Sequence, residues 1–322
     1  MAGEEEMRRA LVVGGGLAGM AFAATYGDAV VFEARKQLGG FFASDELKVG
    51  EHSGRELVEG LAGRVRALLG ETVFESEGNG VWSVGVNGAE FHEGLPVLAT
   101  GFREKTPVEL GVYGFRPAGV FPLTAAWDLV NMGYSIGERV VVYGFNHYSL
   151  SLIAKIHKVC EKLVVVYDEE SYVHKPEEAG DYGAELVKGR VLYVEGRQRV
   201  ERLRTSAGYV EADTLVLAKL APLRLLNAEL AVGNAGMVIE DPAKVAESAR
   251  LLALTLTEGG ELGRVHGEVP AVPSVFSVKH PYVMVGVPSG VKLEVAGRVF
   301  SAEEPYPVVE LPPERKVVIR VV

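Results

Sequence analysis

Three glycines and a glutamate near the N-terminus have the types and spacing that bind a dinucleotide. Gly14, Gly16 and Gly19 follow a short apolar run, and Glu33 ends a second one. The first glycine permits a tight turn, the second lets backbone approach a pyrophosphate, and the third allows a helix to pack closely on a sheet. The helix N-terminus favours phosphate, and Glu33 is placed to accept hydrogen bonds from an adenosine ribose. The alternative is a glycine-rich turn that binds nothing.

A strand–turn–helix–strand unit is needed to position these residues. We expect a buried strand at 10–13, a helix of small residues after it, and a second strand at 29–33 that is followed by Gly39-Gly40. The short separation between Gly19 and Glu33 predicts a short helix.

The same plan recurs later in the chain. A strand at 140–143 meets Gly144, a helix is expected from about 149 to 162, and a strand at 163–167 ends at Asp168-Glu169. Each copy then leads through antiparallel strands to a returning apolar strand, at 96–101 and at 215–218. A βαβ unit followed by a meander and a returning strand, present twice, predicts two dinucleotide-binding domains.

The predicted fold class is therefore α/β, with two Rossmann-like dinucleotide-binding domains of three layers (ββα) and a small C-terminal β-rich module. The expected limits are 1–108 with 222–258 for the first domain, 109–221 for the second and 259–322 for the module. Segment 102–138, rich in Gly and Pro, is interpreted as a hinge and linker, and 243–256 as an amphipathic helix with Val245, Ala249 and Leu252 on one face.

Composition excludes several classes of function. The net charge of −10 leaves no basic stripe to neutralise phosphates, so we expect no nucleic-acid partner. No apolar run is long enough to span a bilayer, and glycines and acidic residues argue against a signal peptide, so a cytoplasmic protein is expected. The acidic run at 3–6 is expected to be solvated surface. The two glutamines hint at a thermophilic source.

Few residues suggest catalysis or metal binding. Cys160 is the single cysteine, and we expect it to pack within a helix rather than react. The histidines form no HExxH and no carboxylates cluster at metal spacing, so we predict no metal, and the catalytic residues stay unknown. His52 and Ser53 could approach a cofactor, but a solvated loop is favoured there.

Several short motifs resemble one family. The run Val97-Leu98-Ala99-Thr100-Gly101 resembles the domain junction of FAD-dependent, thioredoxin-reductase-like flavoproteins of the pyridine nucleotide-disulfide oxidoreductase class. Residues 116–121 and 129–131 are similar to the FAD-binding subunits of dye-linked amino-acid dehydrogenases and of hydrogen cyanide synthase. The run 231–234 resembles the closing flavin motif of that family, and 282–288 a late strand of the same subunits. The resemblance covers residues 10–258 well.

The resemblance implies that FAD binds to the first domain. It places Gly14, Gly16 and Gly19 at the pyrophosphate, Glu33 at the adenosine ribose, Gly40 and Phe41 toward the flavin, and the later motifs around the cofactor. The implied cofactor-binding residues are Gly14, Gly16, Leu17, Ala18, Gly19, Glu33, Ala34, Gly40, Phe41, Thr100, Gly101, Gly233 and Asn234. A plain β-turn at Gly233-Asn234 is the alternative there.

The second fingerprint departs from the pattern. Residues 144–149 keep only the first glycine, because Asn146 and Ser149 stand where the second and third would be. The junction after the returning strand reads Ala218-Lys219-Leu220 and lacks the expected glycine, whereas Asp168 preserves an acidic strand tip. We favour lost or altered NAD binding over normal binding and leave NAD(H) open. His147 is interpreted as a surface residue, with a new polar site as the alternative.

The resulting hypothesis is an FAD-dependent oxidoreductase without a redox-active disulfide. It would pass electrons between a small organic donor or NADH and a partner, which is a protein subunit or a second copy of the chain. One alternative is a self-sufficient NADH-dependent flavin reductase. Another is a non-catalytic nucleotide-binding subunit that scaffolds a complex.

Overall fold

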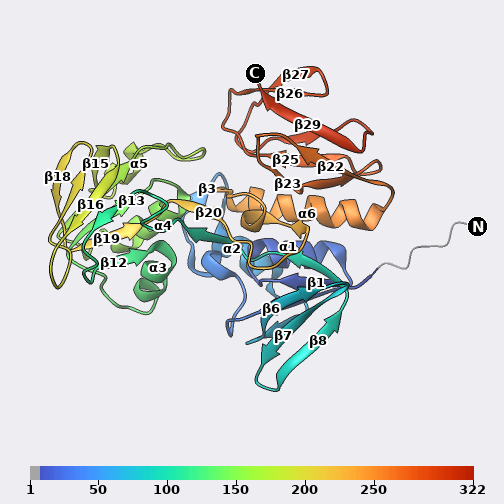
Figure 1. Ribbon diagram of the computed structural model, residues 1–322, viewed down its shortest axis with the longest axis horizontal. Helices are drawn as coiled ribbons and strands as arrows, with labels where there is room; N and C mark the ends of the chain where they lie inside the picture. The colour runs from blue at the N-terminus through green and yellow to red at the C-terminus, as the bar shows by residue number, and fades with distance from the viewer. Residues whose placement is uncertain (1–7) are drawn as a thin grey trace, which may run out of the picture. The chain divides into compact units, whose positions relative to one another are not determined.

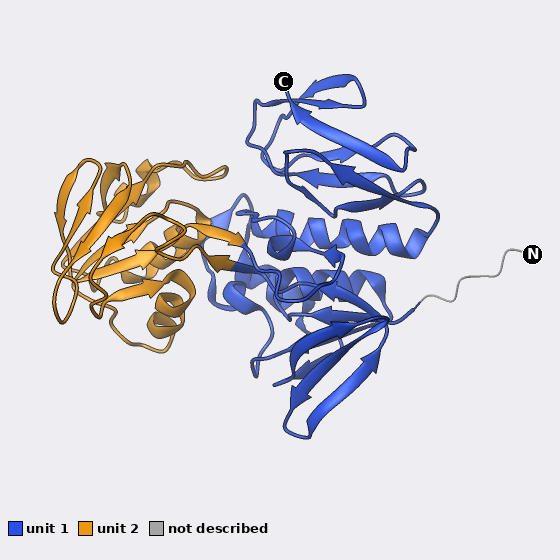
Figure 2. Ribbon diagram, viewed as in Figure 1, with its two compact units in different colours: residues 1–102, 222–322 blue, residues 103–221 orange. Residues whose placement is uncertain are grey.

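A computed structural model describes residues 8–322, so the acidic run at 3–6 lies outside the described part of the chain. The chain divides into two compact units (Figure 2). Unit 1 consists of residues up to 102 together with 222–322, and unit 2 of residues 103–221. The chain passes between them along β10 (Phe102–Glu104) and β20 (Leu220–Pro222), which pair with each other. The three-part division predicted from sequence stays a prediction.

Unit 1 is built on a parallel five-stranded sheet of order β21-β9-β1-β2-β5. Its strands are β1 (Ala10–Val13), β2 (Ala29–Glu33), β5 (Ala67–Leu69), β9 (Leu95–Leu98) and β21 (Leu230–Ala231). All neighbours in it are parallel. Every residue of β1 and β2 is buried, as expected of a parallel sheet that is covered on both faces.

The two faces of this sheet have different covers (Figure 1). Helices α1 (Leu17–Tyr26) and α6 (Pro242–Glu258) pack against each other on one face. The antiparallel meander β6 (Thr72–Glu77), β7 (Gly80–Gly85) and β8 (Gly88–Glu93) covers the other, and its buried Val81 joins the sheet's apolar core. This is the predicted ββα layering. Val245, Ala249 and Leu252 of α6 are buried, which confirms the predicted amphipathic face.

The segment after β2 holds a correction to the sequence interpretation. It contains a 3-10 helix at Gly40–Ser44, the strand pair β3 (Lys48–Val49) and β4 (His52–Ser53), and α2 (Gly54–Ala62). Ser53 is buried rather than in a solvated loop, because its Oγ accepts from the Glu56 N–H at 3.2 Å while Glu56 Oε2 accepts from the Ser53 N–H at 2.9 Å. This reciprocal capping box starts α2.

The C-terminal part of unit 1 is the predicted β-rich module. One sheet has the order β24-β22-β29-β26-β27 and another β23-β25-β28. The strands are β22 (Leu262–His266), β23 (Ala271–Val272), β24 (Val275–Ser277), β25 (Tyr282–Val285), β26 (Lys292–Val295), β27 (Arg298–Ser301), β28 (Val308–Glu310) and β29 (Lys316–Val321). The module has its own core around Phe276, Leu293 and Ile319, and α6 contacts β24 and β25.

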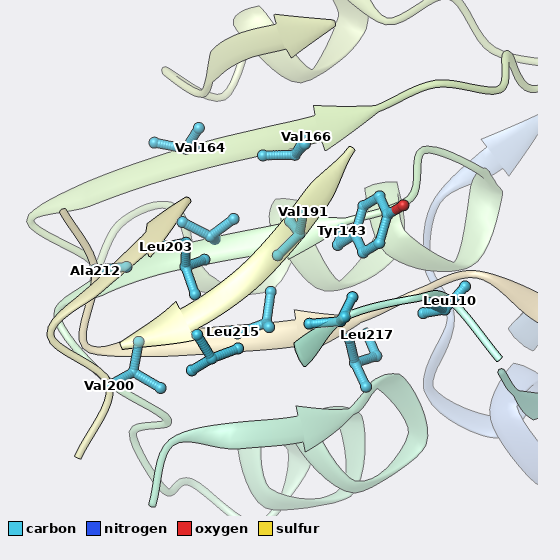
Figure 3. Close-up of a cluster of buried hydrophobic side chains, with 13 residues drawn as sticks. Leu110, Tyr143, Val164, Val166, Val191, Val200, Leu203, Ala212, Leu215 and Leu217 are labelled. Carbon is cyan, nitrogen blue, oxygen red and sulfur yellow. The ribbon is translucent and has the colours of Figure 1, made fainter. Parts of the chain in front are cut away.

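Unit 2 repeats the plan of unit 1. Its parallel sheet has the order β12-β19-β13-β14-β15, and an antiparallel sheet has the order β11-β16-β17-β18. The strands are β11 (Tyr113–Gly114), β12 (Val120–Pro122), β13 (Arg139–Tyr143), β14 (Lys162–Tyr167), β15 (Glu185–Lys188), β16 (Val191–Glu195), β17 (Arg202–Thr205), β18 (Gly208–Glu211) and β19 (Thr214–Leu217). Figure 3 shows the apolar core that both sheets share, with Val166, Leu203 and Leu215 among its members.

Two predictions about unit 2 are wrong. Segment 102–138 is not a linker, because β12 pairs with β19 and α3 (Leu123–Asn131) buries Leu123 and Trp127. Helix α4 (His147–Ile156) ends six residues before the predicted limit, so Cys160 lies beyond the helix and is half-buried. The short helix α5 (Glu177–Gly180) completes the unit. The fold class itself is confirmed, with two Rossmann-like units and a β-rich module.

Candidate functional site

The turn after β1 has the close backbone contacts that its glycines predict. Gly14 has φ +110°, and a Cβ there would lie 2.4 Å from the Ala99 carbonyl oxygen. A Cβ on Gly19 would lie 2.1 Å from the Gly14 carbonyl oxygen. Both positions therefore exclude a side chain, since atoms cannot approach so closely without moving backbone. Gly14 sets the turn and Gly19 sets the contact between helix and strand.

The N-terminus of α1 is open. Gly16 is the N-cap residue, and no side chain in residues 8–322 makes a capping hydrogen bond to the helix. A Cβ on Gly16 would meet no atom of the described chain within 4 Å, although its backbone has an ordinary φ of −72°. The N–H groups of a helix's first turn have no partner within the helix, so an uncapped end attracts an anion. Gly16, Leu17 and Ala18 therefore border a place for a phosphate.

The Glu33 carboxylate is buried beside this turn. Its Oε2 accepts from the Gly15 N–H at 2.8 Å and its Oε1 from the Arg35 N–H at 2.8 Å. Each carboxylate oxygen has a further lone pair, so the two bonds hold the group in place and leave it able to accept from a hydroxyl. Ala34, which follows, is exposed.

The Gly-Gly pair lies against the same turn. The Gly39 N–H donates to the Gly15 carbonyl oxygen at 2.8 Å, and Gly16 and Gly39 form an isolated β-bridge. A Cβ on Gly40 would be 3.4 Å from the Gly16 Cα. Phe41 follows, with its ring centroid 6.1 Å from that of Phe102. The structure thus brings residues 39–41 to the open N-terminus of α1.

The closing motif reaches α1 from the C-terminal side. A Cβ on Gly233 (φ +54°) would lie 2.5 Å from the Ala18 Cβ, and the Gly233 N–H donates to Ser248 Oγ at 3.2 Å. Asn234 is buried, and its Oδ1 accepts from the Ile239 N–H at 2.7 Å. Gly233 therefore borders the candidate site, whereas the Asn234 amide also holds its own loop together.

Thr100 and Gly101 are joined to a neighbouring segment of unit 1. The Thr100 hydroxyl donates to the Leu223 carbonyl oxygen, and the Gly101 carbonyl accepts from the Leu223 N–H at 3.0 Å. Gly101 has φ +79°, a conformation that favours glycine. These bonds give Thr100 a structural role in the strand that returns from unit 2.

Sequence reasoning missed Gly15, the middle residue of the glycine run. A Cβ there would lie 2.5 Å from the Leu38 Cδ2 and 3.0 Å from the Glu33 Cβ, so Gly15 is what lets Glu33 approach the turn. The sequence could have indicated this role, because the GxGxxG pattern requires no glycine at its second position and this chain has Gly15 there.

The corresponding turn in unit 2 has the same backbone conformation at its first glycine and different side chains after it. Gly144 has φ +111°, and its N–H donates to the Val166 carbonyl at 2.9 Å, as the Gly14 N–H does to Phe32. Asn146 Oδ1 accepts from the Ser149 N–H at 3.0 Å, while Ser149 Oγ accepts from the Asn146 N–H at 3.0 Å. This capping box uses the end of α4 that would otherwise face a phosphate.

The strand register corrects the position given to Asp168. Val13 pairs with Phe32, after which comes Glu33, whereas Tyr143 pairs with Val166, after which comes Tyr167. Tyr167 is therefore the counterpart of Glu33, and Asp168 lies one residue further along. Its Oδ1 is 2.7 Å from the Nζ of Lys219, which is 8% exposed.

His147 is fully buried, so its predicted surface position is wrong. Its Nδ1 lies 3.0 Å from His174 Nε2, and His174 Nδ1 lies 2.8 Å from Glu178 Oε2. The histidine is thus part of the packing around the start of α4 and not a new polar site open to solvent.

Four further features bear on function: metal-binding groups, membrane-spanning helices, the Cys160 thiol and one cavity. In residues 8–322, no group of three or more His, Cys, Asp or Glu side chains could hold a metal ion, and no helix is long and apolar enough to cross a membrane. Burial, with a contribution from Asp213, raises the pKa of the Cys160 thiol to about 11. A cavity of about 1050 Å³ opens beside Leu95 and Leu230. These begin β9 and β21, and parallel α/β sheets bind ligands at the opposite ends of their strands.

Comparison with known proteins supports the fold. No protein-family model matches the sequence, and no curated protein matches it significantly. The chain is similar to a thioredoxin reductase from T. acidophilum, with TM-score 0.58 and 16% identity over 78% of this chain and 98% of that one. It is also similar to an L-proline dehydrogenase from P. horikoshii, with TM-score 0.55 and 18% identity over 78% of this chain. A flavoprotein disulfide reductase from Escherichia coli gives TM-score 0.55 and 13% identity over 89% and 81%.

These similarities define a class of fold. The chain spans only about half of the proline dehydrogenase, 55% of its length. At such low identity they show that the two Rossmann-like units have the architecture found in thioredoxin reductase. The resemblance to subunits of dye-linked dehydrogenases and of hydrogen cyanide synthase stays a prediction.

Proposed function

We propose that unit 1 binds FAD and that the protein is an FAD-dependent oxidoreductase without a redox-active disulfide. The observation that carries this proposal is the uncapped N-terminus of α1 with open space at Gly16. A pyrophosphate would accept from the N–H groups there, and the fixed Glu33 carboxylate would accept from the ribose hydroxyls. The single cysteine leaves no dithiol, so a disulfide mechanism has no second thiol within the chain.

Each protein group has a part in holding the cofactor. Gly16, Leu17 and Ala18 would offer backbone to the pyrophosphate, Glu33 would fix the adenosine end, and Gly40 and Phe41 would lie toward the ring system. When bound, FAD accepts two electrons and a proton from an organic donor and returns them to an acceptor. We propose that a protein partner, as a subunit or a second copy, receives the electrons.

The test is Gly16→Ala. The added methyl group meets nothing in the structure and the backbone angle suits alanine, so the variant should fold as the parent does. If a pyrophosphate lies against Gly16, affinity for FAD should fall at least tenfold, followed by visible absorbance on reconstitution. Gly60→Ala in α2, which also adds a methyl group in open space, is the matched control and should leave binding unchanged.

The outcomes separate the competing functions. A protein that takes up no FAD contradicts the proposal and leaves the scaffold hypothesis. Equal FAD binding by the parent and by Gly16→Ala places the cofactor elsewhere. An anaerobic titration with NADH then tests the donor, because bleaching of the flavin band by NADH alone supports the self-sufficient reductase.

A further inference from the structure

We infer that unit 2 is closed to dinucleotides by its own side chains, and that the Lys219 ammonium group occupies the ends of the strands where an adenosine ribose would otherwise bind. The inference goes beyond FAD binding in unit 1 and concerns three differences between unit 2 and unit 1. At each of them, a side chain of unit 2 contacts the chain itself where unit 1 would contact a ligand. The comparison with unit 1, which has the same βαβ plan, shows what each difference changes.

The first difference closes the phosphate position. In unit 1 the helix after the turn has a glycine N-cap and no side-chain cap. In unit 2 the Asn146 and Ser149 side chains satisfy each other's N–H groups, and Asn146 Nδ2 donates to the Ala218 carbonyl oxygen at 2.7 Å. Asn146 is therefore held at both ends of its amide. A pyrophosphate would have to break these bonds to reach the helix.

The second difference removes the ribose acceptor. In unit 1 the Gly15 N–H bonds the Glu33 carboxylate at 2.8 Å. The register makes Phe145 and Tyr167 the counterparts of those residues, and their ring centroids are 6.4 Å apart. Two aromatic rings thus replace a glycine and a carboxylate, and the position has no group that accepts from two adjacent hydroxyls.

The third difference supplies an internal cation. The Ala99 N–H donates to the Val13 carbonyl in unit 1, and the Ala218 N–H to the Tyr143 carbonyl in unit 2, so Lys219 is the counterpart of Thr100. Its Nζ lies 2.7 Å from Asp168 Oδ1 and 3.0 Å from Glu169 Oε1. Although burial opposes the charge, these two hydrogen bonds raise the pKa of Lys219 above its ordinary value.

The charged groups at the end of β14 therefore have their partners within the chain. The ammonium group lies 5.6 Å from the centroid of the Tyr143 ring, which is also in the shared core in Figure 3. A buried charge with its partners in place is stable, whereas removal of one partner leaves the others uncompensated. A ribose that displaced Lys219 would leave its charge without these carboxylates. A dinucleotide would therefore have to break the ion pairs of Lys219 as well as the capping bonds of Asn146 and Ser149.

The binding test uses ADP-ribose and NADH, measured by anaerobic isothermal titration calorimetry on the full chain saturated with FAD, so that the site proposed in unit 1 is filled. A chain that takes up no FAD contradicts the proposed function, whereas binding of ADP-ribose to the FAD-saturated chain contradicts only this inference, so the two failures are distinct. The parent should show no saturable binding of either probe at millimolar concentration. The triple variant N146G/S149G/K219G, with its fold checked by circular dichroism, should bind ADP-ribose at least tenfold more tightly than the parent.

A double-mutant cycle on melting temperature tests the inference if the triple variant does not fold. Lys219→Met keeps the length of the side chain and removes its charge, and Asp168→Asn removes the acceptor charge. Lys219→Met alone should lower the melting temperature by a few degrees. Asp168→Asn should lower it clearly in the parent and little in Lys219→Met, since the two groups form one pair.

Three results would overturn the inference. Micromolar binding of NADH or ADP-ribose by unit 2 of the parent contradicts closure. A folded triple variant that gains no binding contradicts the roles assigned to Asn146, Ser149 and Lys219, since Phe145 and Tyr167 are unchanged in it. Strictly additive effects of Lys219→Met and Asp168→Asn contradict the internal replacement of a ligand by Lys219.

Discussion

Gly19 lies so close to Gly14 that a Cβ on it would be 2.1 Å from the Gly14 carbonyl oxygen. The first turn of α1 is therefore pressed against the end of β1, and Gly19→Ala must move backbone. We expect the variant to lose about 1–3 kcal/mol of unfolding free energy, as measured by urea denaturation.

The matched control is again Gly60→Ala. In the interior of α2 and without a neighbour within 4 Å, it should gain about 0.5–1 kcal/mol through its higher helix propensity. A Gly19→Ala protein as stable as the parent contradicts the packing described for the turn.

Gly16→Asn should raise the stability of the apoprotein and abolish its uptake of flavin. Asn is a good N-cap, and Gly16 has extended backbone with no neighbour in the way, so the apoprotein should gain a few tenths of a kcal/mol. Flavin uptake should be lost, because the amide then takes the place of the phosphate, as Asn146 does in unit 2. Thermal melting and visible absorbance measure the two effects. Retained flavin with raised stability is the result that speaks against the proposal.

Asn146→Ala should destabilise unit 2. The variant loses the side chain that caps α4 and leaves a helix N–H group unsatisfied, which costs about 0.5–2 kcal/mol by urea denaturation. The exposed Gln198→Ala is the control and should stay within about 0.5 kcal/mol of the parent. A loss no larger than that of the control would show that the capping box contributes nothing.

Cys160 should resist alkylation. Burial, assisted by Asp213, raises the pKa of the thiol from 9.0 to about 11, so the folded protein holds its proton more tightly than the unfolded chain does. Iodoacetamide at pH 8 should therefore react much more slowly than with the urea-unfolded protein.

The same shift of the Cys160 pKa makes stability depend on pH. Because the unfolded thiol ionises first, its contribution to stability is complete below pH 9 and is lost as pH rises toward 11. Cys160→Ser should remove that part of the pH dependence. Rapid alkylation at pH 8 in the folded state is the contrary outcome.

Local patterns predicted the architecture well. The glycine spacing, the acidic strand end and the repeat of the βαβ plan yielded both Rossmann-like units, and alternation yielded the C-terminal module. Segment 102–138 was misassigned because its Gly and Pro content masked α3, whose stability comes from burying Leu123 and Trp127. Such tertiary burial overrides local propensity and is not visible in the segment itself.

Long-range partners could not be predicted from composition or spacing. Glu33 and Gly15 can each be seen in the sequence, but their contact cannot. The register that makes Tyr167, and not Asp168, the counterpart of Glu33 depends on pairing across the sheet. The ion pair between Lys219 and Asp168 joins residues 51 positions apart. Cytoplasmic location and a thermophilic source stay predictions, as do the FAD contacts of the thirteen candidate residues.

The sheet order of unit 1 has a consequence for synthesis on the ribosome. Its edge strand β21 and its covering helix α6 come from residues 230–258, after all of unit 2 has been made. A nascent chain therefore exposes the apolar side of α1 while residues 103–221 emerge. All strands of unit 2 are synthesised before the parallel sheet of unit 1 is complete. Such delayed closure leaves a period in which chaperones can recognise the incomplete first unit.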